Sequence, residues 1–101
     1  MGLAEHKRED RRLLILKALA SENDYAISDM VIRSMLREYG HSESADTIRT
    51  DIAWLDEQGL VTSERVGVAT VAIITDRGLD VANGHSIVPG VRRPRPGECN
   101  G

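Results

Sequence analysis

Residues 44–61 are SADTIRTDIAWLDEQGLV. Ser44 is a favourable helix N-cap, because its hydroxyl can accept a hydrogen bond from an otherwise unpaired backbone N–H of the first turn. Gly59 supplies the C-terminal stop, since glycine adopts the left-handed conformation that ends many helices. The apolar residues between them recur at helical spacing: Ile48, Ile52 and Leu55. The sequence therefore predicts a helix that buries one face and leads into a β-strand.

Two further helices are expected before this one. The residues from about Lys7 to Ala20 are rich in leucine and alanine, which favours a helix over a strand. The apolar arc of this helix is wide, so we expect it to be deeply buried or to offer a second apolar face to a partner. The next helix begins at the N-cap Ser28 and ends at Gly40.

A β-hairpin and a short helix are expected after residue 59. The hairpin is formed by residues 60–66 and 69–74, with Gly67 at its turn, and Thr75 caps a last helix that ends near Ala82. Helix, helix, turn, helix and hairpin are the order of a winged helix-turn-helix. We therefore predict an α+β, mostly α fold with three helices, a β-hairpin wing and a short C-terminal helix.

The chain has 101 residues, which suits a single domain. We assign residues 7–84 to the winged helix-turn-helix domain and residues 1–6 to a flexible N-terminus. Residues 85–101 are rich in proline, glycine and arginine, a composition typical of an extended basic C-terminal arm.

Charge and cysteine content limit the class of protein. The net charge is −3, from 13 Lys and Arg against 16 Asp and Glu, which gives no general attraction for nucleic acid. Basic residues nevertheless cluster in residues 5–17 and in the C-terminal arm. The single cysteine, Cys99, cannot form an internal disulfide, which favours a reducing compartment. With no apolar run long enough to cross a bilayer and no signal-peptide pattern, we expect a cytoplasmic protein without membrane contact.

Two motifs carry a family resemblance. Residues 47–52 (Thr-Ile-Arg-Thr-Asp-Ile) are followed by Leu55-x-x-x-Gly-Leu-Val61, and this segment resembles the recognition helix of DeoR- and ArsR-type bacterial repressors. Residues 74–78 (Ile-Thr-Asp-Arg-Gly) resemble the strand-to-helix junction after the wing in those families. The overall layout, including the Val-Pro-Gly-Val-basic-Pro tail, is similar to that of small winged-helix proteins of Mu-like prophages.

The resemblance implies a small DNA-binding transcriptional regulator, encoded by a phage or prophage and acting as a homodimer on double-stranded DNA. The helix at 44–58 would enter the major groove, and the wing would touch the backbone or the minor groove. The implied DNA-binding residues of this helix are Ser44, Asp46, Thr47, Arg49, Thr50, Ala53 and Trp54. Wing and tail would add Arg65, Arg92, Arg93 and Arg95.

The acidity of the same helix favours an alternative. Between residues 43 and 57 there are five acidic residues and one basic residue, Arg49, and outward-facing carboxylates repel phosphates. A winged helix also serves as a protein-binding module, because the fold alone does not determine its use. The alternative is an adaptor or phage assembly protein whose acidic helix docks on a basic protein partner.

Three residues of this helix also have purely structural interpretations. Arg49 can pair with a neighbouring carboxylate of the helix instead of DNA. Trp54 can pack under the hairpin or the tail. Asp51 can bond within the fold, so its charge need not face a partner.

Catalysis and metal binding have no support in the sequence. It contains no glycine-rich phosphate loop, nucleophile elbow or His-Glu-x-x-His motif, so we do not expect an enzyme. The potential metal ligands have no close-spaced pair: His6, His41, His85 and Cys99. We accordingly expect no metal and no cofactor.

Overall fold

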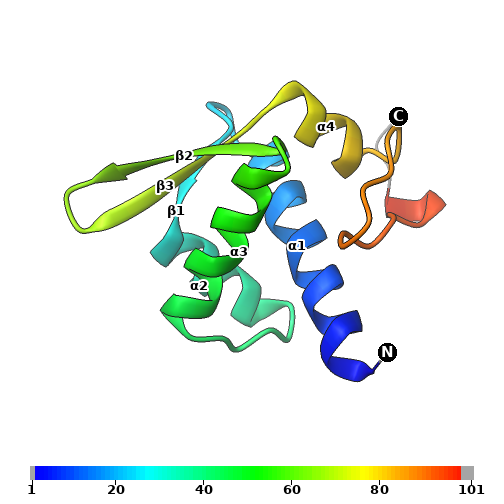
Figure 1. Cartoon of the computed structure of the whole chain (residues 1–101), viewed down its shortest axis with the longest axis horizontal. Helices are drawn as coiled ribbons and strands as arrows, with labels where there is room; N and C mark the ends of the chain where they lie inside the picture. Colours follow the sequence, from blue (N-terminus) through cyan, green and yellow to red (C-terminus); the bar gives the residue numbers. More distant parts are fainter. Residues whose placement is uncertain (1, 99–101) are drawn as a thin grey trace.

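The computed structural model describes residues 2–98; Cys99 lies outside the described residues. Its elements, in chain order, are α1 (Leu3–Ser21), β1 (Ala26–Ser28), α2 (Asp29–Glu38), α3 (Ala45–Glu57), β2 (Val61–Val66), β3 (Ala69–Ile74), α4 (Asp76–Ala82) and the short 3₁₀ helix η1 (Pro96–Glu98). Figure 1 shows β2 and β3 as a long hairpin that projects from the helices. The prediction of an α+β, mostly helical winged-helix fold is confirmed.

The helix starts follow the capping residues. Ser28 accepts a hydrogen bond from the backbone N–H of Val31, and Ser44 accepts one from Thr47 at 3.1 Å. Thr75 caps α4 in the same way. Each cap satisfies a backbone donor that the first helical turn leaves without an intrahelical partner.

The sheet contains one strand that was not predicted. The strand order is β1-β3-β2 and both pairs are antiparallel, so β3 lies in the middle. Ile27 of β1 is paired with Ala72 of β3, and both are buried. The chain reaches β1 through Tyr25, whose φ of 60° is unusual for a non-glycine residue. A three-residue strand has too few residues to show an alternating pattern, which explains why it was missed.

The core is built around α1. Four of its apolar residues are fully buried and belong to one core cluster with residues of α2, α3, α4 and the sheet: Leu13, Ile15, Leu16 and Leu19. The wide apolar arc of this helix therefore belongs to the core. The predicted flexible segment 1–6 is wrong from Leu3 onward, because α1 already begins there.

The predicted extended arm is also wrong for residues 85–98. Val88 and Val91 are buried in the core cluster, which holds this segment against the rest of the fold. The backbone N–H of Arg92 donates to the carbonyl of Glu9 at 3.2 Å, and Arg12 donates to the carbonyl of Gly90 at 3.1 Å. The segment thus packs back along α1. The apolar surface of its two valines is buried there, although the overall composition of the segment is polar and proline-rich.

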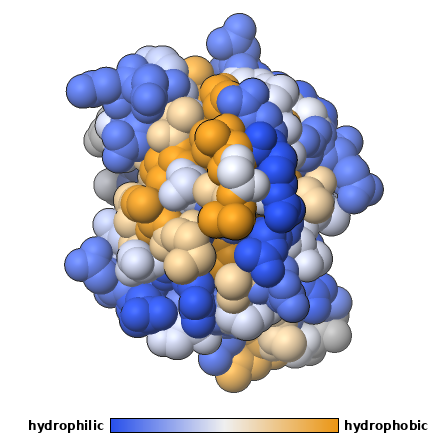
Figure 2. Space-filling model, turned by 90° about the vertical axis from the view of Figure 1, so that its left-hand side faces the viewer, coloured by the Kyte–Doolittle hydropathy of each residue, from blue (hydrophilic) through white to orange (hydrophobic). Residues whose placement is uncertain are grey.

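Two surface properties complete the description. Within residues 2–98, no helix is both long and apolar enough to cross a membrane. Figure 2 shows apolar side chains gathered in the middle of the face that carries the wing. The large exposed hydrophobic residues of the wing and of the start of α2 are Met30, Val31, Val66 and Val68.

Candidate nucleic-acid interface

The orientation of α3 agrees with the predicted helical spacing. Ile48, Ile52 and Leu55 are buried on its inner face. The outer face carries the exposed residues Asp46, Thr50, Ala53 and Glu57. Because α2 packs beside α3 and β2 follows it directly, the outer face of α3 and the wing hairpin form neighbouring parts of one surface.

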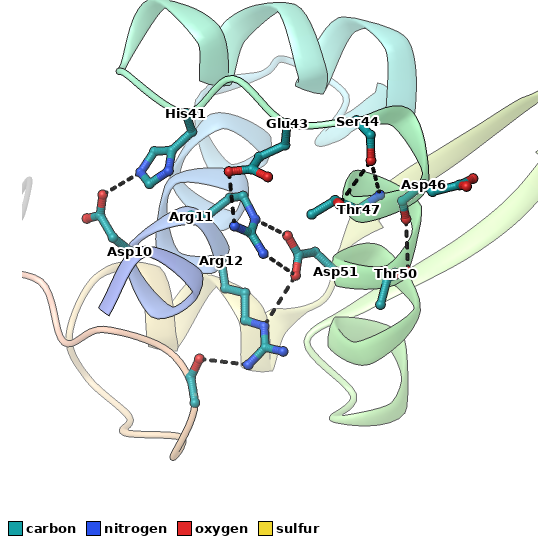
Figure 3. A network of polar contacts seen from close by, with 11 residues as sticks. Asp10, Arg11, Arg12, His41, Glu43, Ser44, Asp46, Thr47, Thr50 and Asp51 are labelled. Atoms are coloured by element: carbon teal, nitrogen blue, oxygen red, sulfur yellow. Dashed lines mark hydrogen bonds and ion pairs between the residues drawn. The ribbon is translucent and has the colours of Figure 1, made fainter. Parts of the chain in front are cut away.

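A buried ion pair fixes α3 to α1. Asp51 is only 2% exposed, and Arg11 is 7% exposed. Arg11 donates from Nε to one carboxylate oxygen of Asp51 and from Nη2 to the other, the second at 3.2 Å. Figure 3 shows this two-point contact, together with Arg12, whose Nε lies 3.5 Å from Asp51. Asp51 therefore holds the helix in place and contributes no charge to the outer face.

Most other carboxylates of residues 43–57 are also used inside the molecule. Glu43 lies 3.6 Å from Arg11, and Asp46 lies 2.6 Å from Arg49. Asp56 accepts hydrogen bonds from the backbone N–H and the hydroxyl of Ser63, at 3.1 and 2.7 Å, and so ties α3 to β2. Only Glu57 in this group of acidic residues has no hydrogen-bond or ion-pair partner within residues 2–98. Most carboxylates of this helix are thus paired within the protein, so they repel the phosphates of a DNA duplex less than the sequence alone predicts.

Arg49 lies between two carboxylates. Asp46 accepts from its Nη2 at 2.6 Å, and Asp29 of α2 lies 3.4 Å from its Nη1. The hydrogen bond to Asp46, and then that to Asp29, raise the pKa of Arg49. Asp29 is buried and also accepts hydrogen bonds from the backbone N–H groups of Met30 and Thr70. Arg49 is therefore oriented by α2 and by its own helix, as the structural interpretation anticipated in part.

The strand register places Arg65 on the α3 side of the wing. Side chains alternate along a strand, so Arg65 lies on the same face as Ser63, whose hydroxyl contacts Asp56 of α3. Arg65 is exposed. Its guanidinium therefore extends the surface formed by the outer face of α3.

Trp54 packs under residues 85–98, which are called the tail from here on. The guanidinium carbon of Arg12 lies 3.8 Å from the centre of the Trp54 ring. A Cβ atom on Gly90 would lie 2.7 Å from the same ring, so only glycine allows the tail to pass this closely. One of the two structural interpretations of Trp54 is confirmed, and the ring is half-buried between α1 and the tail.

The tail arginines do not form one free basic arm. Arg92 donates to Asp10 at 2.7 Å and to Glu98 at 2.9 and 3.0 Å. The hydrogen bond from Arg92, helped by the backbone N–H of Arg95, lowers the pKa of Glu98 to about 2. Burial alone would raise the pKa of Asp10, but hydrogen bonds from His41 and Arg92 lower it. Arg93 and Arg95 are exposed, whereas Arg92 holds residues 85–98 against α1 through its contacts with Asp10 and Glu98.

Hydroxyl groups line the start of α3. The hydroxyl oxygens of Ser44 and Thr47 are 3.0 Å apart, and the hydroxyl of Thr50 donates to the backbone carbonyl of Asp46 at 2.8 Å. Figure 3 shows these contacts beside the Arg11–Asp51 pair. All three hydroxyls are therefore close to the outer face, where an external acceptor can replace a local one.

A polar groove separates α1 from the start of α3. Its volume is about 280 Å³, and it is lined by Arg8, Arg11, Arg12, Asp46, Thr47, Thr50 and Asp51. Three guanidinium groups meet two carboxylates here, and one of these carboxylates, that of Asp46, also pairs with Arg49. The groove therefore has an excess of positive charge next to an acidic helix.

Sequence reasoning missed two residues that organise this surface. Arg11 was included in a basic helix start, but it is the buried partner of Asp51. Asp29 lies in the first turn of α2, and it also contacts Arg49 and the wing. Arg11 and Asp51 are 40 positions apart, and Asp29 and Thr70 are 41 positions apart. No local sequence pattern could therefore have indicated these contacts. Within residues 2–98, no group of three His, Cys, Asp or Glu side chains is placed to hold a metal ion.

Comparison with known proteins relates the chain to a domain family and to two uncharacterized proteins. The family model of the ribonuclease R winged-helix domain matches residues 13–81. A protein of Escherichia phage Mu, described as uncharacterized protein gp26, is 47% identical over 88 residues, which are 87% of this chain and 91% of that protein. An uncharacterized protein of Haemophilus influenzae is 42% identical over 80 residues, 78% of each chain.

Proposed function

Because this chain belongs to the winged-helix family and is similar to a protein of phage Mu, we propose that it is a small phage-associated transcriptional regulator that binds double-stranded DNA. In this proposal α3 enters the major groove, and the wing touches the backbone or the minor groove. The major groove of B-DNA is wide enough for one α-helix, and α2 braces α3 from behind.

The observation that carries the proposal is the internal use of the acidic side chains of α3. Asp51 and Asp56 are bonded to Arg11 and Ser63, and Asp46 is paired with Arg49. Among the five acidic residues between positions 43 and 57, only Glu57 has no partner within the described residues 2–98. The surface around it gains positive charge from Arg65 of the wing. A duplex would therefore meet much less negative charge than the composition of the helix suggests.

Different residues would have different roles in this interface. The hydroxyls of Ser44, Thr47 and Thr50 would contact phosphates, or the methyl groups of the two threonines would contact thymine methyl groups. Arg49 would read a guanine or bind a phosphate. Asp46 would direct Arg49, Ala53 would allow close approach, and Trp54 would support the helix from the tail side. Arg65 would bind the backbone or the minor groove, with Arg93 and Arg95 adding charge near the tail.

We further propose that the protein binds its site as a homodimer, because two α3 helices one helical turn apart would read successive major grooves. Light scattering after size-exclusion chromatography measures the mass of the complex with a duplex. Two protein chains for each duplex are the expected result, and one chain would refute the dimer.

The test of DNA binding is an NMR titration of labelled protein with a random-sequence duplex at low and moderate salt. We expect the largest shifts in residues 44–54, Arg65 and the exposed tail arginines, and we expect them to weaken as salt is raised. In a selected site, Arg49→Ala should cost about 1–3 kcal/mol of binding free energy. If the amides of α3 do not shift, the regulator proposal fails.

A second candidate is a protein-binding module, favoured by the exposed apolar residues of the wing in Figure 2. A basic partner would pair with Asp46 and Glu57 while its apolar residues cover Val66 and Val68. An oligolysine peptide with flanking leucines is the probe. Shifts of α3 and wing amides with this peptide, and none with the duplex, would favour this function instead.

A further inference from the structure

We propose that the groove between α1 and the start of α3 is a phosphate-binding site that holds one phosphodiester of the nucleic-acid backbone. This inference rests on the proposed function, which brings a duplex against α3, and adds a discrete anchoring point on α1. The groove opens beside the outer face of α3, because Asp46 and Thr50 belong to both surfaces. A DNA strand that passes α3 would therefore run along this groove.

The charge in the groove is not balanced by its own carboxylates. Arg11 donates one hydrogen bond to each oxygen of Asp51, so this carboxylate is largely used by a single guanidinium. Arg12 approaches the same carboxylate only to 3.5 Å. The carboxylate on the rim, Asp46, is paired with Arg49 at 2.6 Å. A further anion would thus complete the pairing of Arg8 and Arg12.

The guanidinium of Arg12 is preorganised to bind such an anion. Its guanidinium stacks on Trp54 at 3.8 Å, and its Nη1 donates to the carbonyl of Gly90 at 3.1 Å. Its Nε is buried and has no hydrogen-bond partner within residues 2–98. Burial lowers the pKa of Arg12; the charge of Asp51 only partly opposes this, and the nearby charge of Arg8 adds to the lowering. The guanidinium is thus fixed in position, which lowers the entropic cost of binding.

Arg8 and the two threonines supply the adaptable side of the site. Arg8 is exposed and lies one helical turn before Arg11 and Arg12 on the same face of α1. It has no partner among the described residues, so its guanidinium can close over a ligand. The hydroxyls of Thr47 and Thr50 line the opposite wall and can redirect their hydrogens toward phosphate oxygens.

The size and chemistry of the groove fit a phosphate group. About 280 Å³ is the volume of several water molecules, at roughly 30 Å³ for each in liquid water, so a phosphate enters with solvent. Phosphate oxygens accept hydrogen bonds only, and a planar guanidinium offers two parallel donors to them. An apolar ligand would leave these donors without acceptors.

The first experiment compares Arg8→Gln with Lys7→Gln. Both substitutions remove one exposed positive charge at neighbouring positions, but Lys7 faces a different pocket, beside His6 and Asp10. The affinity for a random-sequence duplex is measured against salt concentration. If the groove binds a phosphate, Arg8→Gln lowers the salt slope by about one unit, while Lys7→Gln changes it by much less. Equal slopes for the two variants would overturn the site.

The second experiment uses inorganic phosphate without DNA. Saturable shifts of the Thr47 and Thr50 amides and of the Arg12 Nε–H in the natural protein, absent in Arg8→Gln, support the site. Duplex-induced shifts of α3 combined with equal effects of the two variants would refute the site and leave the proposed function standing. Phosphate-induced shifts without any duplex binding would show a site for a free phosphate ligand, which refutes both the backbone assignment and the DNA-binding function.

Discussion

Replacing Asp51 by alanine tests whether the buried ion pair holds α3 on α1. The substitution leaves Arg11, which is 7% exposed, with Glu43 at 3.6 Å as its one remaining ion-pair partner among residues 2–98. Breaking a buried pair by removing one partner costs about 3–5 kcal/mol, because the remaining charge stays desolvated. Since Glu43 compensates in part, we expect a loss of about 3 kcal/mol in the free energy of unfolding.

The matched control is Asp46→Ala, on the same helix. Its carboxylate side chain is 91% exposed and paired with Arg49, and exposed pairs contribute about 0–1 kcal/mol. Both variants are measured by chemical denaturation followed by circular dichroism, with thermal melts alongside. For a domain of this size, about 3 kcal/mol lowers the midpoint of thermal unfolding by roughly 12–24 °C.

A double variant separates charge pairing from packing. Replacing Arg11 by methionine and Asp51 by leucine removes both charges while keeping similar side-chain volume. Buried pairs replaced in this way are often neutral or stabilising, so the double variant should recover most of the loss. The reasoning is refuted if Asp51→Ala is no more harmful than Asp46→Ala, or if the double variant is as unstable as the single one.

Three further predictions concern the caps and the tail. Gly90→Ala should destabilise the fold by about 1–3 kcal/mol in denaturation experiments, because φ is +99° and the new Cβ would lie 2.7 Å from Trp54; an unchanged stability would show that the tail can move aside. The pKa of Glu98 is lowered to about 2 from its ordinary 4.5, so its pairing with Arg92 stabilises the docked tail above pH 4.5 and is lost as the pH falls toward 2. NMR should record the release of the tail in that interval, and Glu98→Gln should weaken docking already at pH 7. Ser44→Ala should cost about 1 kcal/mol because the cap of α3 is lost, which a urea titration measures against the exposed control Ser42→Ala.

The parts of the fold that could be predicted are those with local causes. Ser28 and Ser44 mark helix starts because a cap bonds to a backbone N–H three residues away. The β-branched run of β3 likewise indicated a strand from its own composition. β1 could not be found in this way, because its strand character arises from pairing with β3, more than forty positions later.

The candidate site shows the same division. The outward side of α3 followed from helical spacing, since the inward positions are the apolar ones. The partners of its charged residues did not follow, because a sequence shows that Asp51 is acidic but not that Arg11 lies beside it. The tail was misjudged for a related reason. Its prolines and arginines suggested an extended arm, and only Val88 and Val91 hinted at burial.

The docked tail also has a consequence for the order in which the protein folds. α1 is synthesised first, yet its polar partner Arg92 follows Asp10 by 82 positions. Contacts between such distant segments form late, because the chain must first close a long loop. During translation the core around α1 therefore stays incomplete until the segment with Val88 and Val91 has been made. A ribosome stalled before residue 88 should carry a nascent chain that is sensitive to protease and that binds chaperones, and a stall well beyond residue 98 should not.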